Sequence, residues 1–310
     1  MDFAGKGHTL SGAFVKKREV FAPLQGRSLP YGSAGAGDAT DPRLQGGTAM
    51  LKVATLASGS SGNCAVVSDG RVHILIDAGI STRRISQGLK ALDIELRHIS
   101  GVLLTHEHTD HVAALPVLCR QTDAPLYTAE ETACALCGRW DGLVERFRVF
   151  EPGQRFAVGG LEVGTFPTSH DCARPCGFSV SDGQRKLVLC TDTGVVTPQA
   201  REAVRGAHTL IGEFNYDPEM LRKGPYPLHL QVRIRGEQGH LSNEMGGQLA
   251  AWAGSQGTRR VILAHLSQEN NRPALALEAA KRALRELGLG EKDVELVAAP
   301  RNDMTGWMEV

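Results

Sequence analysis

Seven consecutive residues, Thr105-His106-Glu107-His108-Thr109-Asp110-His111, contain three imidazoles and two carboxylates. They follow the apolar run Gly101-Val102-Leu103-Leu104, which predicts a buried strand that gives way to a loop. His106 and His108 can converge on one cation, and the adjacent Asp110 and His111 can serve a second. Such ligands suit Zn, Mn or Fe(II). The alternative, a solvated histidine-rich loop, is disfavoured because charged residues rarely crowd against a buried strand without a partner.

Three further candidate ligands each follow an apolar segment downstream. His170 comes after residues 161–166, Asp192 after residues 186–190, and His265 after residues 260–264. If these segments and the strand before His106 belong to one sheet, their ends meet at one edge, and the side chains would complete a metal site there.

Asp77 ends another apolar run, Ile74-Leu75-Ile76, and stands beside a glycine. A carboxylate in that place either caps the following helix or orients a metal-bound histidine from behind. Both roles remain open on the local pattern alone.

The elements that would position these residues alternate between strand and helix from residue 50 onward, which predicts an α/β protein. Residues 177–180 and 186–190 predict a hairpin closed by Ser181-Asp182-Gly183. Helical periodicity covers residues 81–92, 111–118, 130–137, 243–253 and 274–287.

The composition fits a globular protein, with 42% hydrophobic residues in a chain of 310, enough for one large or two ordinary domains. Lys+Arg and Asp+Glu number 34 each, so any contact with nucleic acid must come from a local patch.

The locally basic stretch contains Arg222, Lys223, Arg233 and Arg235 and leads to Gly239-His240-Leu241-Ser242-Asn243. The alternative interpretation is a solvated loop followed by a helix cap at Ser242 or Asn243.

The seven cysteines are odd in number and show no disulfide framework, which predicts a reducing, cytoplasmic environment. Cys134 and Cys137 form a lone C-x-x-C motif, but a structural zinc site needs four paired ligands, so buried inert thiols are expected.

No stretch approaches the ~20 apolar residues of a membrane span. The basic residues Lys16-Lys17-Arg18 precede too short an apolar run for a signal peptide.

Residues 1–49 are rich in glycine and lack apolar periodicity, which predicts a disordered N-terminal extension. The functional domain is expected to span residues 50–310 and to begin at Met50. The preceding 49 residues would then be a tail or the product of an upstream start site.

The ordered set His106-x-His108-x-Asp110-His111, His170, Asp192 and His265, with Asp77 as a first motif, resembles the metallo-β-lactamase superfamily. The resemblance covers residues 50–310. It implies a single four-layer αββα domain, with two mixed β-sheets flanked by helices and a dinuclear metal site at one edge. His106, His108 and His170 would bind the first metal, and Asp110, His111 and His265 the second. Asp192 would bridge two divalent ions, zinc or manganese, with iron also allowed.

Within the superfamily, the segments at residues 56–63, 224–227, 239–243 and 265–267 resemble the WalJ/YycJ-like branch of exonuclease-like hydrolases. This implies a phosphodiesterase or nuclease that binds DNA transiently and attacks it through a metal-bridging hydroxide. Asp110 and His240 are the expected catalytic residues, with His240 binding the phosphate or protonating the leaving oxygen.

The expected substrate-binding residues are Ser58, Ser60, Asn63, Asn215 and His240. The first three belong to a Gly/Ser turn whose hydroxyl and backbone N–H groups either only close the turn or also face an anion. Where the branch commonly has Asn-His-Asp, this chain has Asn215-Tyr216-Asp217, so no imidazole role is carried over there.

Three other functions are compared with the nuclease prediction. A thioester or lactone hydrolase of the glyoxalase II type would use the same ligands on a carbonyl. A catalytically silent metal-binding or regulatory protein is disfavoured by the complete ligand set. A redox di-iron protein would typically have a carboxylate where His108 stands.

Overall fold

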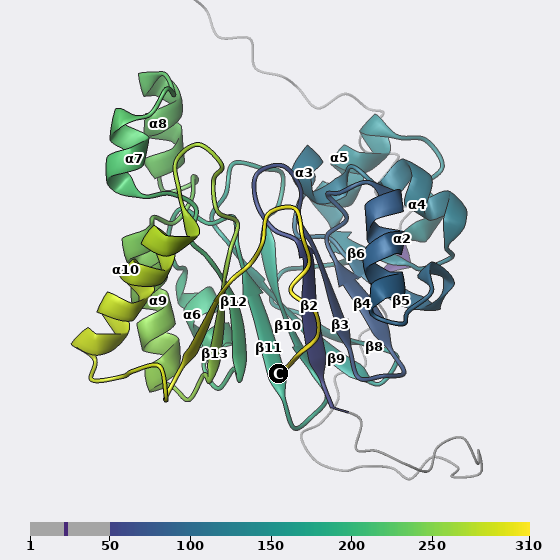
Figure 1. Ribbon diagram of the computed structural model, residues 1–310. Coiled ribbons are helices and arrows are strands. Elements are labelled where there is room, and N and C mark those ends of the chain that lie inside the picture. The colour runs from purple at the N-terminus through teal and green to yellow at the C-terminus, as the bar shows by residue number, and fades with distance from the viewer. Residues whose placement is uncertain (1–21, 24–49) are drawn as a thin grey trace, which may run out of the picture.

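Two β-sheets stacked face to face, with helices on both outer sides, form the four layers of the molecule (Figure 1). The computed structural model describes residues 22–23 and 50–310. One sheet has the strand order β1-β7-β6-β5-β4-β3-β2-β15, and the other has the order β14-β13-β12-β11-β10-β9-β8. Both sheets mix parallel and antiparallel neighbours, which confirms the expected αββα architecture.

The strands and helices alternate along most of the chain. The first sheet contains β1 (Ala22–Pro23), β2 (Lys52–Ala57), β3 (Cys64–Ser68), β4 (His73–Ile76), β5 (Ile99–Leu103), β6 (Leu126–Ala129), β7 (Phe147–Phe150) and β15 (Met308–Glu309). The second contains β8 (Arg155–Val158), β9 (Leu161–Pro167), β10 (Cys176–Ser181), β11 (Lys186–Cys190), β12 (Thr209–Glu213), β13 (Arg260–Ala264) and β14 (Glu295–Ala298).

The helices divide between the two sheets. The first sheet is accompanied by α2 (Thr82–Ala91), α3 (Thr109–Val112), α4 (Leu115–Gln121), α5 (Glu130–Arg139) and the short 3-10 turns η3 (Leu96–His98) and η4 (Val144–Arg146). The second is accompanied by α6 (Pro198–Val204), α7 (Pro218–Lys223), α8 (Leu228–Arg235), α9 (Asn243–Ser255) and α10 (Pro273–Glu286).

Apolar side chains fill three layers. The central layer lies between the sheets and joins residues such as Ile76 and Leu103 to Phe178 and Ile211. The outer layers lie under α2, α4 and α5 on one side and under α6, α9 and α10 on the other. The inner strands are therefore buried on both faces, which explains their continuous apolar runs.

The strand directions bring several strand ends to one edge of the molecule. β4 is parallel to β5, and β11, β12 and β13 are mutually parallel. β9 runs the same way as β11, since β10 lies between them and is antiparallel to both. Their carboxyl ends lie at the upper edge in Figure 1, beside α3. Side chains that follow these strands therefore meet there.

The hairpin expected at residues 177–190 is confirmed, because β10 and β11 pair antiparallel. The single helix expected over residues 111–118 is wrong: the structure has α3 and then α4. Pro116 explains the second start, since proline lacks an N–H and favours the first turn of a helix.

The predicted extension, residues 1–49, lies outside the described residues except for 22–23, which form β1 and pair parallel with β7. In the described part of the chain, no helix is long and apolar enough to cross a membrane.

Gly79 gives a test of how tightly the loop after β4 packs against residues 105–111. A Cβ atom added to Gly79 would lie 1.6 Å from the backbone oxygen of Asp110. Gly79→Ala should therefore lower the free energy of unfolding by about 1–3 kcal/mol in chemical denaturation, as overpacking does. Gly138→Ala is the matched control, because its Cβ meets nothing within 4 Å and α5 would gain helix propensity. Equal stability of the two variants would contradict this packing.

Candidate active site

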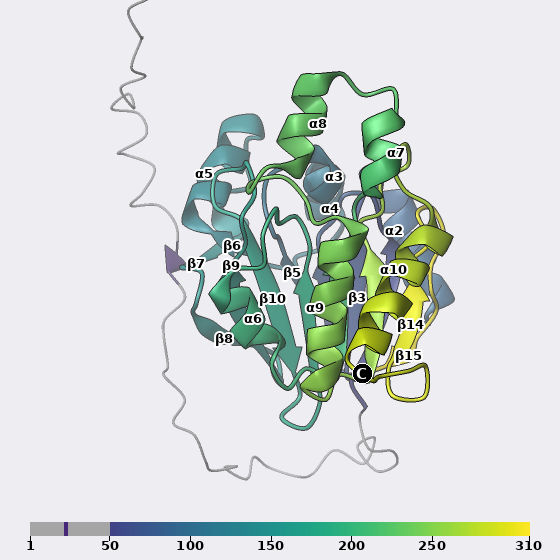
Figure 2. The same ribbon diagram turned by 90° about the vertical axis from the view of Figure 1, so that its left-hand side faces the viewer.

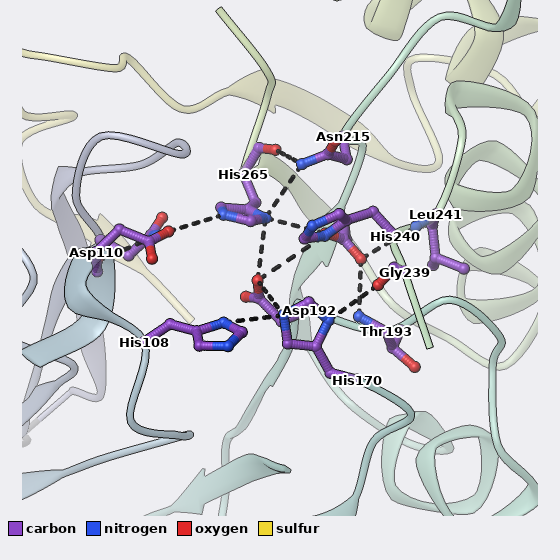
Figure 3. Close-up of polar contacts among 12 residues, drawn as sticks. His108, Asp110, His170, Asp192, Thr193, Asn215, Gly239, His240, Leu241 and His265 are labelled. Atoms are coloured by element: carbon purple, nitrogen blue, oxygen red, sulfur yellow. Dashed lines mark hydrogen bonds and ion pairs between the residues drawn. The ribbon is translucent and has the colours of Figure 1, made fainter. Parts of the chain in front are cut away.

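All seven predicted metal ligands converge at the edge where the strand ends meet. His106, His108, Asp110 and His111 come from the segment that joins β5 to α3, whereas His170, Asp192 and His265 follow β9, β11 and β13. The expectation of one shared sheet is wrong, because β5 belongs to the first sheet and the other three strands to the second. In Figure 3 the labelled members of this set point toward one another from separate elements.

Among the described residues the candidate ligand atoms form four overlapping groups, and two of these are separate sets of three residues. Those of His106, His108 and His170 lie within 4.8 Å of one another, and so do those of Asp110, His111 and His265. These are the two sets that the sequence resemblance implied.

Asp192 lies between the two groups. One oxygen is 3.5 Å from His111 Nε2, and the other is 3.4 Å from His265 Nδ1 and 3.9 Å from His170 Nε2. A carboxylate in this place can contact ions held by either group.

The outward-facing ring nitrogen of three of these histidines is held by the protein. His170 Nδ1 donates to the backbone oxygen of Gly239 at 3.0 Å. His111 Nδ1 lies 2.8 Å from Asp77 Oδ2, and His265 Nδ1 lies 2.9 Å from Glu213 Oε1. These contacts orient the rings and leave Nε2 of each facing inward, as in histidine metal sites.

Three inward-facing polar atoms have no hydrogen-bond partner. His106 Nε2, His265 Nε2 and Asp192 Oδ2 are buried and make no hydrogen bond in the described part of the chain. Buried polar atoms are rarely left unsatisfied, so these three mark a place for a bound group. Imidazole and carboxylate donors fit a divalent cation.

The electrostatics of the cluster also suit cations. Burial holds the pKa of His106 well below its ordinary value, so the ring is neutral and can act as a ligand. Burial opposes charge on His265 too, yet the carboxylates of Asp192, Asp110 and Glu213 raise its pKa to about 10. Without a cation, protons offset the buried negative charge; a divalent ion would replace them.

Asp77 lies where an orienting residue should. It accepts hydrogen bonds from the backbone N–H and the hydroxyl of Thr105, at 2.9 and 3.0 Å, in addition to its contact with His111. The Thr105 hydroxyl is in turn 3.0 Å from His106 Nδ1. One carboxylate therefore supports a ligand of each group.

Glu213 is the residue that the sequence interpretation missed. It ends β12, is fully buried, and accepts hydrogen bonds from the backbone N–H groups of Thr193 and Leu241. Its Oε1 contacts both His265 Nδ1 and His240 Nδ1, the latter at 2.7 Å. Burial opposes ionisation, but these two rings hold the pKa of Glu213 well below its ordinary value. A lone carboxylate ending an apolar strand was the signal available, as it was for Asp192.

The backbone is strained at three of these positions. Asp77, Asp192 and His265 have φ values of 61°, 54° and 56°, a left-handed conformation that non-glycine residues seldom adopt. Each stands just beyond the carboxyl end of its strand. Such strain persists where surrounding contacts enforce it, typically at functional sites.

The residues predicted to bind substrate lie against the ligand residues. Ser58 is buried and its hydroxyl accepts from the backbone N–H of His265 at 2.8 Å. Asn63 Nδ2 is 3.1 Å from His111 Nε2, and Asn215 Nδ2 donates to the His265 backbone oxygen at 3.0 Å. Ser60 is exposed. Ser58 and Asn215 thus position His265, and substrate contact by these residues stays a prediction.

The basic stretch is largely neutralised by its own ion pairs. Arg222 and Lys223 both contact Glu219, and Arg233 makes two hydrogen bonds to Asp171. In the chain from residue 50 on, Arg235 makes no ion pair. The Arg233 contact ties α8 to the loop that carries His170, while α7 and α8 protrude from the site edge (Figure 2).

The cysteines show no metal site. No disulfide bond joins cysteines in the described part of the chain, and Cys134 and Cys137 belong to the apolar layer under α5. No group of potential metal ligands among the described residues includes a cysteine.

These features define a metal-binding protein of the metallo-β-lactamase fold, and comparison with known proteins identifies the family. A family model described as the beta-lactamase superfamily domain matches residues 73–266, and the chain belongs to this superfamily.

The chain is a WalJ/YycJ-like member of it. It is 36% identical to exodeoxyribonuclease YycJ of Bacillus anthracis over 241 residues, which cover 77% of this chain and 91% of the relative. It is 34% identical to exodeoxyribonuclease WalJ of Streptococcus pneumoniae over 243 residues, covering 77% and 90%.

Solved structures agree on the fold. The metallo-beta-lactamase fold protein YhfI from Bacillus subtilis superposes with a TM-score of 0.64 at 17% identity, covering 82% of this chain and 98% of that one. Zn(2+)-bound PqqB from Methylobacterium extorquens superposes with a TM-score of 0.61 at 20% identity, covering 82% and 99%.

The contact between Asp77 and His111 leads to a prediction about metal affinity. Asp77→Asn should weaken metal binding about 10–100-fold, because it removes the charge that orients and polarises the imidazole. Titration against a competing chelator measures this. Asp141→Asn, at an exposed position, is the control. Unchanged affinity in Asp77→Asn would show that the contact is not needed to hold the ion.

Proposed function

We propose that this chain is a metal-dependent phosphodiesterase, a nuclease that acts on DNA. The observation that carries the proposal is the pair of three-residue ligand groups with Asp192 between them. The relatives named exodeoxyribonuclease, which the chain matches over nine-tenths of their length, supply the substrate class.

Two divalent ions are proposed. His106, His108 and His170 would hold the first, Asp110, His111 and His265 the second, and Asp192 would contact both. Zinc and manganese both suit these donors, and iron does too. When bound, two such ions lower the pKa of a water molecule and neutralise charge on phosphate oxygens.

Asp110 contributes a permanent negative charge at the mouth of the site. Burial opposes its ionised form, but the adjacent His111 and His265 rings hold its pKa well below the ordinary value. A quarter of its side chain is exposed, whereas the His111 and His265 rings beside it are buried. Asp110 is thus the most exposed of the three proposed ligands in its group.

His240 is placed to handle a proton. Its Nδ1 is held by Glu213 at 2.7 Å, and its ring is 18% exposed. Nε2 makes no hydrogen bond in the described chain and is left to meet a substrate oxygen. Glu213 fixes the orientation of the ring, so His240 can bind a phosphate oxygen or protonate the leaving oxygen.

The thioester or lactone alternative uses the same ligands but finds no support in the relatives, which are named nucleases. Contact with nucleic acid would be transient, as for a substrate. A cytoplasmic location, which we also propose, is in keeping with cysteines that form no disulfide bond in the described part of the chain.

A substrate panel tests the function. Protein loaded with zinc or manganese should hydrolyse DNA in preference to an acyl thioester, with RNA and small phosphodiesters assayed in parallel. Removal of metal with a chelator should abolish turnover. Asp110→Asn should also abolish it while circular dichroism and thermal unfolding stay close to wild type. Retained activity in Asp110→Asn would refute the two-ion mechanism.

His240→Ala separates a proton-handling role from a ligand role. The variant should lower kcat about 100-fold or more, as loss of a general acid does, with metal content unchanged. His229→Ala, an exposed histidine on α8, is the control. Loss of metal together with the ring would instead make His240 a ligand, grouped with Asp192, Glu213 and His265.

A further inference from the structure

Arg301 has a guanidinium nitrogen that makes no hydrogen bond in the described chain. Its Nε is buried and has no partner in the described chain, and Nη2 makes one long contact, 3.3 Å, to the backbone oxygen of Ser267. A guanidinium carries five N–H donors, and leaving a buried donor unpaired is costly. The side chain therefore has donors to spare.

The segment that carries Arg301 is held beside the turn that follows β2. Pro300 O accepts from Ser58 N at 3.2 Å, and Thr305 N donates to Thr55 O at 3.1 Å. Figure 1 shows this C-terminal segment rising next to the β2–β3 turn at the site edge. Arg301 is thus anchored on both sides.

Gly59 brings the turn close to the Arg301 side chain. A Cβ atom on Gly59 would lie 3.4 Å from Arg301 Cγ and 3.7 Å from Nε. Gly59 also has a φ of 151°, which side-chain-bearing residues rarely adopt. Glycine here permits both the turn and its close approach to Arg301.

The same turn presents further donors. Ser60 and Ser61 are exposed, and in the described chain neither their backbone N–H groups nor their hydroxyls make a hydrogen bond. Arg84 adds a second cation nearby, since its Nη2 donates to Asn302 O at 2.9 Å. Among described residues, neither Arg84 nor Arg301 forms an ion pair with a carboxylate. Guanidinium and turn N–H groups together suit a phosphate.

This group of donors adjoins the metal-ligand cluster. Ser58, at the start of the turn, holds the backbone of His265, and Asn63, at its end, contacts His111. Asn63 also ties the turn together by accepting from Gly59 N at 2.9 Å. An anion bound at the turn would therefore lie beside the reacting centre, not within it.

We propose that Arg301 and the turn residues Gly59, Ser60 and Ser61 form a second anion subsite. It holds a phosphate of the nucleic-acid strand next to the one that is cleaved. The inference rests on the proposed nuclease function and assigns to Arg301 a substrate-binding role outside the metal-ligand set. The planar guanidinium can contact two phosphate oxygens at once, which a lysine cannot reproduce.

Steady-state kinetics of metal-loaded Arg301→Gln test this. KM for a single-stranded DNA oligonucleotide should rise about tenfold with kcat nearly unchanged, the effect of losing one charge-assisted contact. Turnover of bis(p-nitrophenyl) phosphate, which has only one phosphate, should not change. Arg301→Lys should recover only part of the lost affinity. Arg285→Gln, an exposed arginine on α10, should match wild type on both substrates.

Salt dependence gives a second readout. A plot of the logarithm of oligonucleotide affinity against the logarithm of salt concentration should have a shallower slope for Arg301→Gln than for wild type. The expected difference is about 0.7, the contribution of one phosphate contact with a single strand. An unchanged KM and slope, with an active wild type, would overturn the subsite alone. Equal losses on both substrates, with lost metal, would make Arg301 a support for the Ser267 loop and also overturn it. A wild type that cleaves no phosphodiester would overturn the proposed function instead.

Discussion

The site depends on the contacts that two buried carboxylates, Asp77 and Glu213, make with histidine side chains. Each lies at the end of a central strand and holds the outer nitrogen of a histidine, His111 or His265. Burying such charges is costly unless they are fully hydrogen-bonded, and both are, by backbone N–H groups as well as by the rings. The arrangement orients the imidazoles before any ion binds, which limits the entropy lost on binding.

The two-sheet architecture makes this arrangement possible. Ligands come from both sheets, so the site closes only when the central apolar layer brings the sheets together. The left-handed backbone at Asp77, Asp192 and His265 turns each side chain back over its own strand end. The cost of that conformation is of order 1–3 kcal/mol at each position and must be offset by packing elsewhere.

The substrate side is organised differently. A formal net charge of zero and internal ion pairs at Glu219 and Asp171 leave few unpaired cations near the site. Arginines near this edge without a carboxylate partner in the described chain include Arg301, Arg84 and Arg235, and also Arg139, which donates to the backbone oxygen of Glu107. α7 and α8, inserted after β12, add exposed Leu228 and Val232 beside the site edge. Recognition of a nucleic acid would then depend on a few specific contacts, because a chain without net charge provides little long-range electrostatic attraction.

The sequence by itself determined the class of fold and predicted a ligand set. Apolar runs with periods typical of strands and helices predicted the alternation. Polar residues at the ends of those runs, together with the resemblance to the metallo-β-lactamase superfamily, predicted seven ligands. This worked because a charged residue at the end of a buried strand has few structural reasons to be there. The same rule should have found Glu213, which was read as part of the apolar strand that it ends.

Only the tertiary structure decided which residues support the ligands and which face a substrate. The contact between Glu213 and His240 joins residues 27 positions apart, and that between Ser58 and His265 joins residues 207 apart. Arg301 has no distinguishing local pattern, and its unpaired nitrogen exists only because the C-terminal segment packs beside the β2–β3 turn. Local sequence records which side chains are present; long-range packing sets their partners, their burial and hence their chemistry.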